Sequence, residues 1–106
     1  MKVKVIQDHP GEGQFPTFKK GTPVKLTGKE CAEFRHWFPC EIDGYQTYIS
    51  ESFIEKGVLG RDYNHTELVQ HTGDVLIVFE IVNAWLMAVN SEAQTGWIPA
   101  EAVVSI

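Results

Sequence analysis

Residues 95–103 read TGWIPAEAV and supply the clearest structural phrase in the chain. Gly96 suits a backbone position that a side chain would crowd, and Trp97 and Ile98 alternate between the two faces of a strand. Pro99 has no N–H to donate and fixes its φ at about −65°, so strand pairing ends there. The phrase therefore predicts a short strand that runs into a turn.

Alternating apolar residues predict further short strands along the chain, each with one buried face. Gly, Asp and Asn residues between these patterns mark turns. No segment has the spacing of a convincing amphipathic helix, so the predicted fold class is all-β. The alternating sets are Val3/Val5, Val24/Leu26, Phe38/Cys40/Ile42, Leu76/Val78 and Leu86/Ala88.

An internal repeat becomes visible when the two halves are aligned at an offset of about 50 residues. Four blocks recur in the same order, which predicts two small domains, residues 1–54 and residues 58–106. The segment EKGV at residues 55–58 leaves only a very short linker between them. The paired blocks are QDHP (7–10) with RDYN (61–64), FKKGTPVKL (18–26) with QHTGDVLIV (70–78), WFPCEI (37–42) with WLMAVN (85–90), and TYISESFI (47–54) with GWIPAEAV (96–103).

The order of these blocks resembles the Src-homology-3 (SH3) family. In that family an Ala-Leu-Tyr-Asp-Tyr strand precedes a Lys-Lys-Gly-Asp-like turn, a Trp-Trp pair and a Gly-Trp-Ile/Val-Pro phrase. The resemblance implies two small SH3-like β-barrels in tandem, the second closer to the family pattern. The second half carries it on Asp62-Tyr63, Glu67-Leu68, Gly73-Asp74, Trp85 and Gly96–Pro99, and the first half on Asp8-His9, Lys20-Gly21, Trp37, Tyr48–Ser50 and Phe53.

SH3 domains bind extended proline-rich peptides between aromatic rings, beside an acidic pocket that selects Arg or Lys. The resemblance implies ligand-binding positions in both modules: Tyr63, Trp85 and Pro99 with Glu67 or Asp74 in the second, and His9, Trp37 and Phe53 in the first. Each groove departs from the family, because Arg61 and Ala102 replace Tyr in one, while Gln7 replaces Tyr and Ser50 replaces Pro in the other.

We therefore expect a non-catalytic module that binds a protein or peptide, proline-containing or basic, on its aromatic surfaces. Two alternatives stay open at this stage. One is a structural or assembly pair of domains without a peptide groove. The other is an aromatic cage for a cationic group, as in Tudor-like barrels, which resemble SH3 domains in shape.

The composition of the chain indicates which partners and cofactors to expect. The net charge of the 106 residues is −5, and the acidic excess lies in the second half, which disfavours a nucleic-acid partner. No apolar run is long enough to cross a membrane, and no secretory signal is recognisable, so a cytoplasmic location is expected. Cys31 and Cys40 are too few for a disulfide scaffold. No metal site, cofactor or catalytic motif is predicted, and the oligomeric state stays open.

Overall fold

A computed structural model of the protein describes residues 1–11 and 14–106. The fold is all-β, as predicted, and contains several sheets and two single-turn 3₁₀ helices. Within the described residues, no helix has the length and hydrophobicity needed to cross a bilayer.

The chain folds into two compact units. Unit 1 comprises Met1–Gln14 and Thr66–Ile106, and unit 2 comprises Phe15–His65. Unit 2 is therefore inserted into unit 1, and each unit combines segments from both halves of the sequence repeat.

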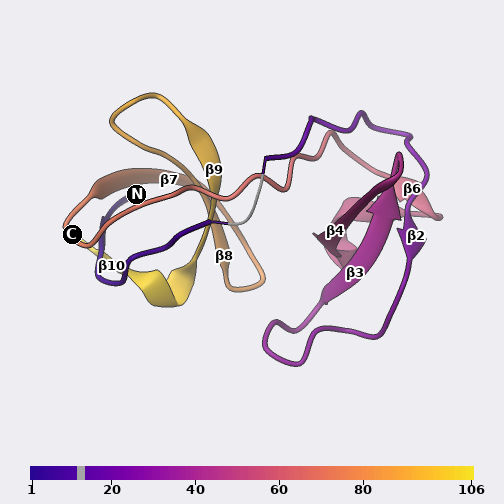
Figure 1. Cartoon of the computed structure of the whole chain (residues 1–106), viewed down its shortest axis with the longest axis horizontal. Helices are drawn as coiled ribbons and strands as arrows, with labels where there is room; N and C mark the ends of the chain where they lie inside the picture. The colour runs from indigo at the N-terminus through magenta and orange to yellow at the C-terminus, as the bar shows by residue number, and fades with distance from the viewer. Residues whose placement is uncertain (12–13) are drawn as a thin grey trace. The chain divides into compact units, whose positions relative to one another are not determined.

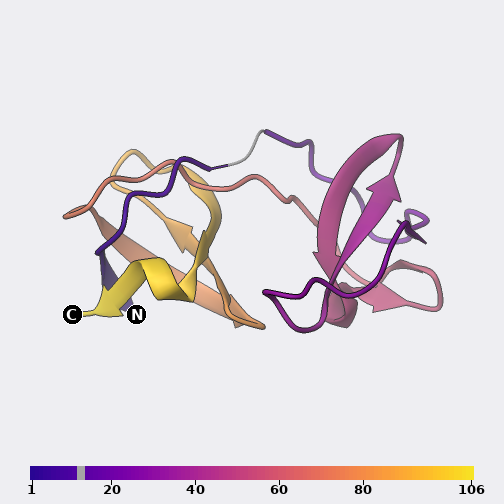
Figure 2. The ribbon, with the colours of Figure 1, turned by 60° about the horizontal axis from the view of Figure 1, so that its bottom comes forward.

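Unit 1 is built on a five-stranded antiparallel sheet in the order β10-β1-β7-β8-β9. Figures 1 and 2 show the two termini at the same end of this unit, where Ile106 N donates to Lys2 O at 3.0 Å. The elements are β1 (Lys2–Val5), β7 (Val75–Val82), β8 (Trp85–Val89), β9 (Thr95–Pro99), the 3₁₀ helix η2 (Ala100–Ala102) and β10 (Val103–Ser105).

Period-two alternation produces the core of unit 1. On β1 the valines are buried and the lysines exposed, and on β7 Leu76 and Val78 point inward. The resulting apolar core consists of Val3, Val5, Leu68, Leu76, Val78, Leu86, Ala88, Ile98 and Ala102. Burial of these side chains is the main stabilising contribution to the unit.

Unit 2 contains a three-stranded sheet in the order β2-β3-β4 and a separate pair, β5-β6 (Figure 1). An isolated bridge between Pro23 and Val58 joins the β2 side to β6. Both hairpins turn on two residues of positive φ, Asp43-Gly44 and Lys56-Gly57. The elements are β2 (Lys25–Leu26), β3 (Trp37–Ile42), β4 (Tyr45–Ser50), the 3₁₀ helix η1 (Glu51–Phe53), β5 (Ile54–Glu55) and β6 (Val58–Leu59).

The division of the chain differs from the predicted modules, residues 1–54 and 58–106. The predicted linker at residues 55–58 is the turn of the β5–β6 hairpin, inside unit 2. β1, from the first half, pairs with β7 and β10 of the second half. The two repeats have thus exchanged their opening strands, because each opening block finds its backbone partners in the other repeat.

The sequence repeat reappears as a repeat of backbone hydrogen bonds. His9 exchanges two with Gln70 at 2.8 and 2.9 Å, and Tyr63 exchanges two with Phe18 at 2.7 and 2.8 Å. Each unit therefore has the same pair of backbone hydrogen bonds, between its opening block and the segment that leads into the following turn.

Candidate functional site

Four of the predicted ligand-binding residues lie in unit 1 around the first residue of β8. Trp85 is half-buried and pairs in register with Pro99. The His9 ring stands edge-on to the indole, with 6.0 Å between ring centroids. His9 Nε2 and Glu67 Oε1 are 2.8 Å apart, and the Glu67 side chain is only 6% exposed. We call these four residues the Trp85 cluster.

Local backbone pairing positions the members of this cluster. The two backbone bonds between His9 and Gln70 hold the main chain at His9, and Leu68 N donates to Trp97 O at 2.9 Å, which fixes the loop beside β9. Trp97 itself is buried, whereas Trp85 is only half-buried. A partly exposed indole beside a buried carboxylate can stack on an apolar ring and attract a cation.

The exchange of opening strands regroups the predicted sites. Tyr63 was expected beside Trp85 and Pro99, and His9 beside Trp37 and Phe53. The structure instead assigns Tyr63 to unit 2 and His9 to unit 1. The predicted membership of each groove is therefore corrected, since each opening block travels with its strand partners.

Three of the predicted ligand-binding residues are interior side chains of unit 2. Tyr63, Trp37 and Phe53 are 2%, 3% and 3% exposed. The Phe53 and Tyr63 rings pack with 5.1 Å between centroids. The Tyr63 hydroxyl donates to the Tyr48 carbonyl and bonds His65 Nδ1 at 2.9 Å. Little of these rings is accessible to a ligand.

Unit 2 nevertheless exposes aromatic surface that the sequence argument did not single out. Tyr45 and Tyr48 are 45% and 43% exposed. Buried His65 lies among rings, 5.4 Å from Phe15 and 6.0 Å from Tyr48 between centroids. The repeat alignment gave no indication of this exposure, because it places Tyr48 over Trp97, which is buried. The centre of this ring cluster is occupied by an imidazole of the chain itself.

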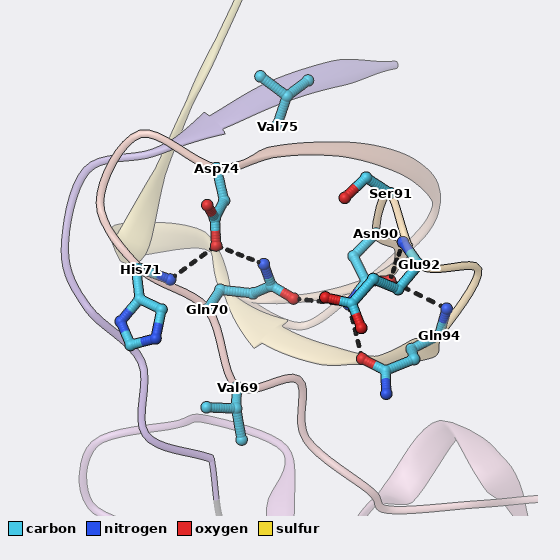
Figure 3. A pocket seen from close by; sticks show the side chains of 9 residues that line it. All are labelled: Val69, Gln70, His71, Asp74, Val75, Asn90, Ser91, Glu92 and Gln94. Atoms are coloured by element: carbon cyan, nitrogen blue, oxygen red, sulfur yellow. Dashed lines mark hydrogen bonds between the residues drawn. The ribbon is translucent and has the colours of Figure 1, made fainter.

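Asp74, the other predicted acidic residue, lies in a polar pocket of about 280 Å³ on unit 1. Asp74 Oδ2 accepts hydrogen bonds from Gln70 Nε2 at 2.8 Å and from His71 N at 2.9 Å. Figure 3 shows the network continuing to Asn90, whose Nδ2 donates to Gln70 Oε1 at 2.9 Å. The Asp74 carboxylate thus stabilises the loop that precedes it in the chain. The lining residues are Val69, Gln70, His71, Asp74, Val75, Asn90, Ser91, Glu92 and Gln94.

The two thiols are held in their protonated form. Burial raises the pKa of Cys40 to about 12, and burial likewise raises the pKa of Cys31. A protonated thiol is a weak nucleophile and a poor metal ligand. In residues 1–11 and 14–106, no three His, Cys, Asp or Glu side chains are placed to share a metal ion.

Comparisons of the chain with protein-family models, with curated proteins and with solved structures find no match.

Proposed function

We propose that the chain is a non-catalytic interaction module made of two SH3-like units that have exchanged their opening strands. Unit 1 binds an extended segment of a partner protein that carries proline and a basic residue. The observation that supports this function best is the Trp85 cluster, in which a partly exposed indole adjoins Pro99 and the His9–Glu67 pair.

The chemistry of this cluster matches the two elements of such a ligand. A proline ring packs well against an indole face, and the preformed polyproline II helix loses little conformational entropy on binding. Glu67 contacts the His9 imidazole, whose ring packs edge-on against Trp85, in a unit with an acidic excess, so it favours a cationic side chain on the ligand.

Unit 2 is proposed to have a structural role, because the positions corresponding to the cluster are closed. Trp37 stands where unit 1 has Trp85, and it is buried. Tyr63 and Phe53 pack on one another, and Ser50 replaces the proline. A cation cage among the unit 2 rings is disfavoured as well, since His65 occupies their centre.

Amide NMR titration with a synthetic proline-rich peptide containing one Arg tests this function. Shifts are expected at the Trp85 indole N–H and at His9 and Glu67. The substitution Trp85→Ala should lower affinity at least about tenfold, since a central aromatic contact is commonly worth more than about 1.4 kcal/mol. Tyr45→Ala, on unit 2, is the control and should leave affinity unchanged.

Two further peptides separate the ligand classes. Replacing every proline by alanine should abolish binding if the polyproline conformation is recognised. Replacing Arg by Glu should weaken binding because of Glu67. A peptide without proline that binds equally well would support a cation cage instead, and spectra that do not change with any peptide would contradict peptide binding by unit 1.

A further inference from the structure

The outward face of β7 carries apolar side chains where a half-exposed strand usually carries polar ones. Leu76 and Val78 point into the core, and the alternate residues Val75, Ile77 and Phe79 are exposed. Phe79 lies at a register shift between Val78 and Glu80, and it is 60% exposed. Three residues of one strand therefore present large apolar groups to solvent, and the register shift places Phe79 outside the regular alternation of Val75 and Ile77.

Two lysines separate this row from a second apolar row. On β1, Lys2 pairs in register with Ile77, and Lys4 pairs with Val75. On the other side of β1, Lys4 pairs with Val104 of β10. Because paired residues in antiparallel strands project to the same face, the lysines lie between Val75/Ile77 and Val104/Ile106. We call these residues, with Phe79, the lysine–apolar face.

The two lysines are unusual within unit 1. They are its only Lys or Arg residues, since neither the rest of residues 1–14 nor residues 66–106 contains another. The acidic residues of these segments are Asp8, Glu12, Glu67, Asp74, Glu80, Glu92 and Glu101. Both Lys residues of this acidic unit thus lie on β1, next to exposed apolar side chains of the neighbouring strands.

We propose that the lysine–apolar face binds a segment of a partner protein in which acidic side chains are flanked by apolar ones. Exposed contiguous apolar surface on a folded domain commonly marks an interaction site. Lys2 and Lys4 are two residues apart on one strand, or about 7 Å. Carboxylates four residues apart on a helix are separated by about 6 Å along its axis, so both can meet a lysine.

Charge favours an acidic partner segment over a second copy of the chain and over an anionic membrane. In a symmetric face-to-face dimer the lysines of one copy would oppose those of the other, which is destabilising. An anionic membrane would attract the two lysines, but it would repel the acidic residues that make up the rest of the charge of unit 1. The net charge of −5 also opposes such binding.

The test uses the full chain and two synthetic amphipathic peptides, one of Leu and Glu, the other with Lys in place of every Glu. Amide NMR should show shifts at β1, β7 and β10 with the Leu–Glu peptide only. Binding should weaken as salt is raised. The double variants Ile77→Thr/Phe79→Thr and Lys2→Glu/Lys4→Glu should each lower affinity at least about tenfold, or about 1.4 kcal/mol.

Leu26→Thr is the matched control, because Leu26 is 47% exposed, close to the 46% of Ile77, and belongs to unit 2. It should leave affinity unchanged, and thermal melts should show that every variant folds. Equal binding of both peptides, or no binding of either, would overturn the proposal. So would sedimentation of the chain with phosphatidylglycerol vesicles, or a dimer that Ile77→Thr/Phe79→Thr dissociates. Shifts confined to the Trp85 cluster would overturn this proposal and leave the proposed function standing.

Discussion

Units 1 and 2 each use an aspartate in the same way three residues after a strand, β1 in unit 1 and β6 in unit 2. Asp8 Oδ1 accepts from Thr72 N at 2.8 Å, and Asp62 Oδ1 accepts from Lys20 N at 2.8 Å. In each unit the bonded N–H belongs to the turn before the next strand. The two units differ at the aromatic positions, where Ala102 in unit 1 corresponds to Phe53 in unit 2.

This difference in one side chain accounts for part of the difference in surface. In unit 2, Phe53 packs on Tyr63, and the Arg61 guanidinium lies 4.7 Å from its ring centroid. In unit 1 the methyl group of Ala102 cannot fill the same space. The two units thus keep the same backbone bonds, while the side chains next to these bonds decide whether a ring is buried or accessible.

The largest expected effect follows from the exchange of opening strands. A fragment of residues 15–65 contains every strand of unit 2 and should fold, with a dispersed amide NMR spectrum. Fragments of residues 1–54 and 58–106 should not fold. The first lacks β6 and the Tyr63 segment, and the second lacks β1, the partner of both β7 and β10.

A mixture of the last two fragments provides the control. If the exchange is correct, mixing 1–54 with 58–106 should restore the missing strand pairs and recover dispersed spectra. Independent folding of both fragments would show that each repeat can close on its own opening strand, and it would refute the exchanged arrangement.

The next effect compares Gly96 with Thr47, which occupy the same place in the repeat. They pair in register with Ala88 and Cys40 respectively. A Cβ at Gly96 would stand 2.9 Å from Thr66 O and 3.1 Å from Leu68 Cγ. Gly96→Thr should therefore lower the free energy of unfolding by about 3 kcal/mol, measured by urea denaturation.

The matched change in unit 2 should not destabilise the protein. Thr47 is buried, and its hydroxyl has no hydrogen-bond partner in the described part of the chain. Thr47→Val keeps the shape and removes an unsatisfied polar atom, so stability should not fall. A loss equal to that of Gly96→Thr would contradict the assigned difference in crowding.

The sequence was sufficient for the all-β class and for most of the short alternating strands, because alternation depends only on which side chains are apolar. The expected buried face at Val24/Leu26 was wrong at Leu26, which is 47% exposed. The sequence did not determine the strand with which each opening block pairs. QDHP and RDYN offer similar backbone groups to either loop, so their resemblance leaves two pairings open. Burial of Tyr63 and Phe53 depends on that pairing and could not be predicted from either half alone.

The sequence predicted which residues form the candidate site, but it did not predict which of them lie together in one unit. Trp85, Pro99, His9 and Glu67 were all named from the resemblance, and the structure brings these four together. Asp74 was chosen for its charge, but it accepts hydrogen bonds from Gln70 and His71. A carboxylate that follows a glycine turn serves a loop as readily as a ligand, and sequence position alone does not separate the two roles.

The smallest effect compares the two aspartates by their titration. The backbone bond from Thr72, with a second from its hydroxyl, lowers the pKa of Asp8, and the backbone bond from Lys20 lowers that of Asp62. A lowered folded-state pKa gives stability that is present above the unfolded value of about 3.9 and is lost as pH falls through the folded value. Asp8→Asn should therefore flatten the acid side of the stability profile, measured as the urea midpoint from about pH 6 to 3. Asp62→Asn should do so less. Asp8 accepts two bonds from Thr72, whereas Asp62 accepts one backbone bond from Lys20 and interacts with the exposed, mobile side chain of Lys19. A larger change with Asp62→Asn would show that this ion pair, rather than the shared backbone bond, governs the difference between the units.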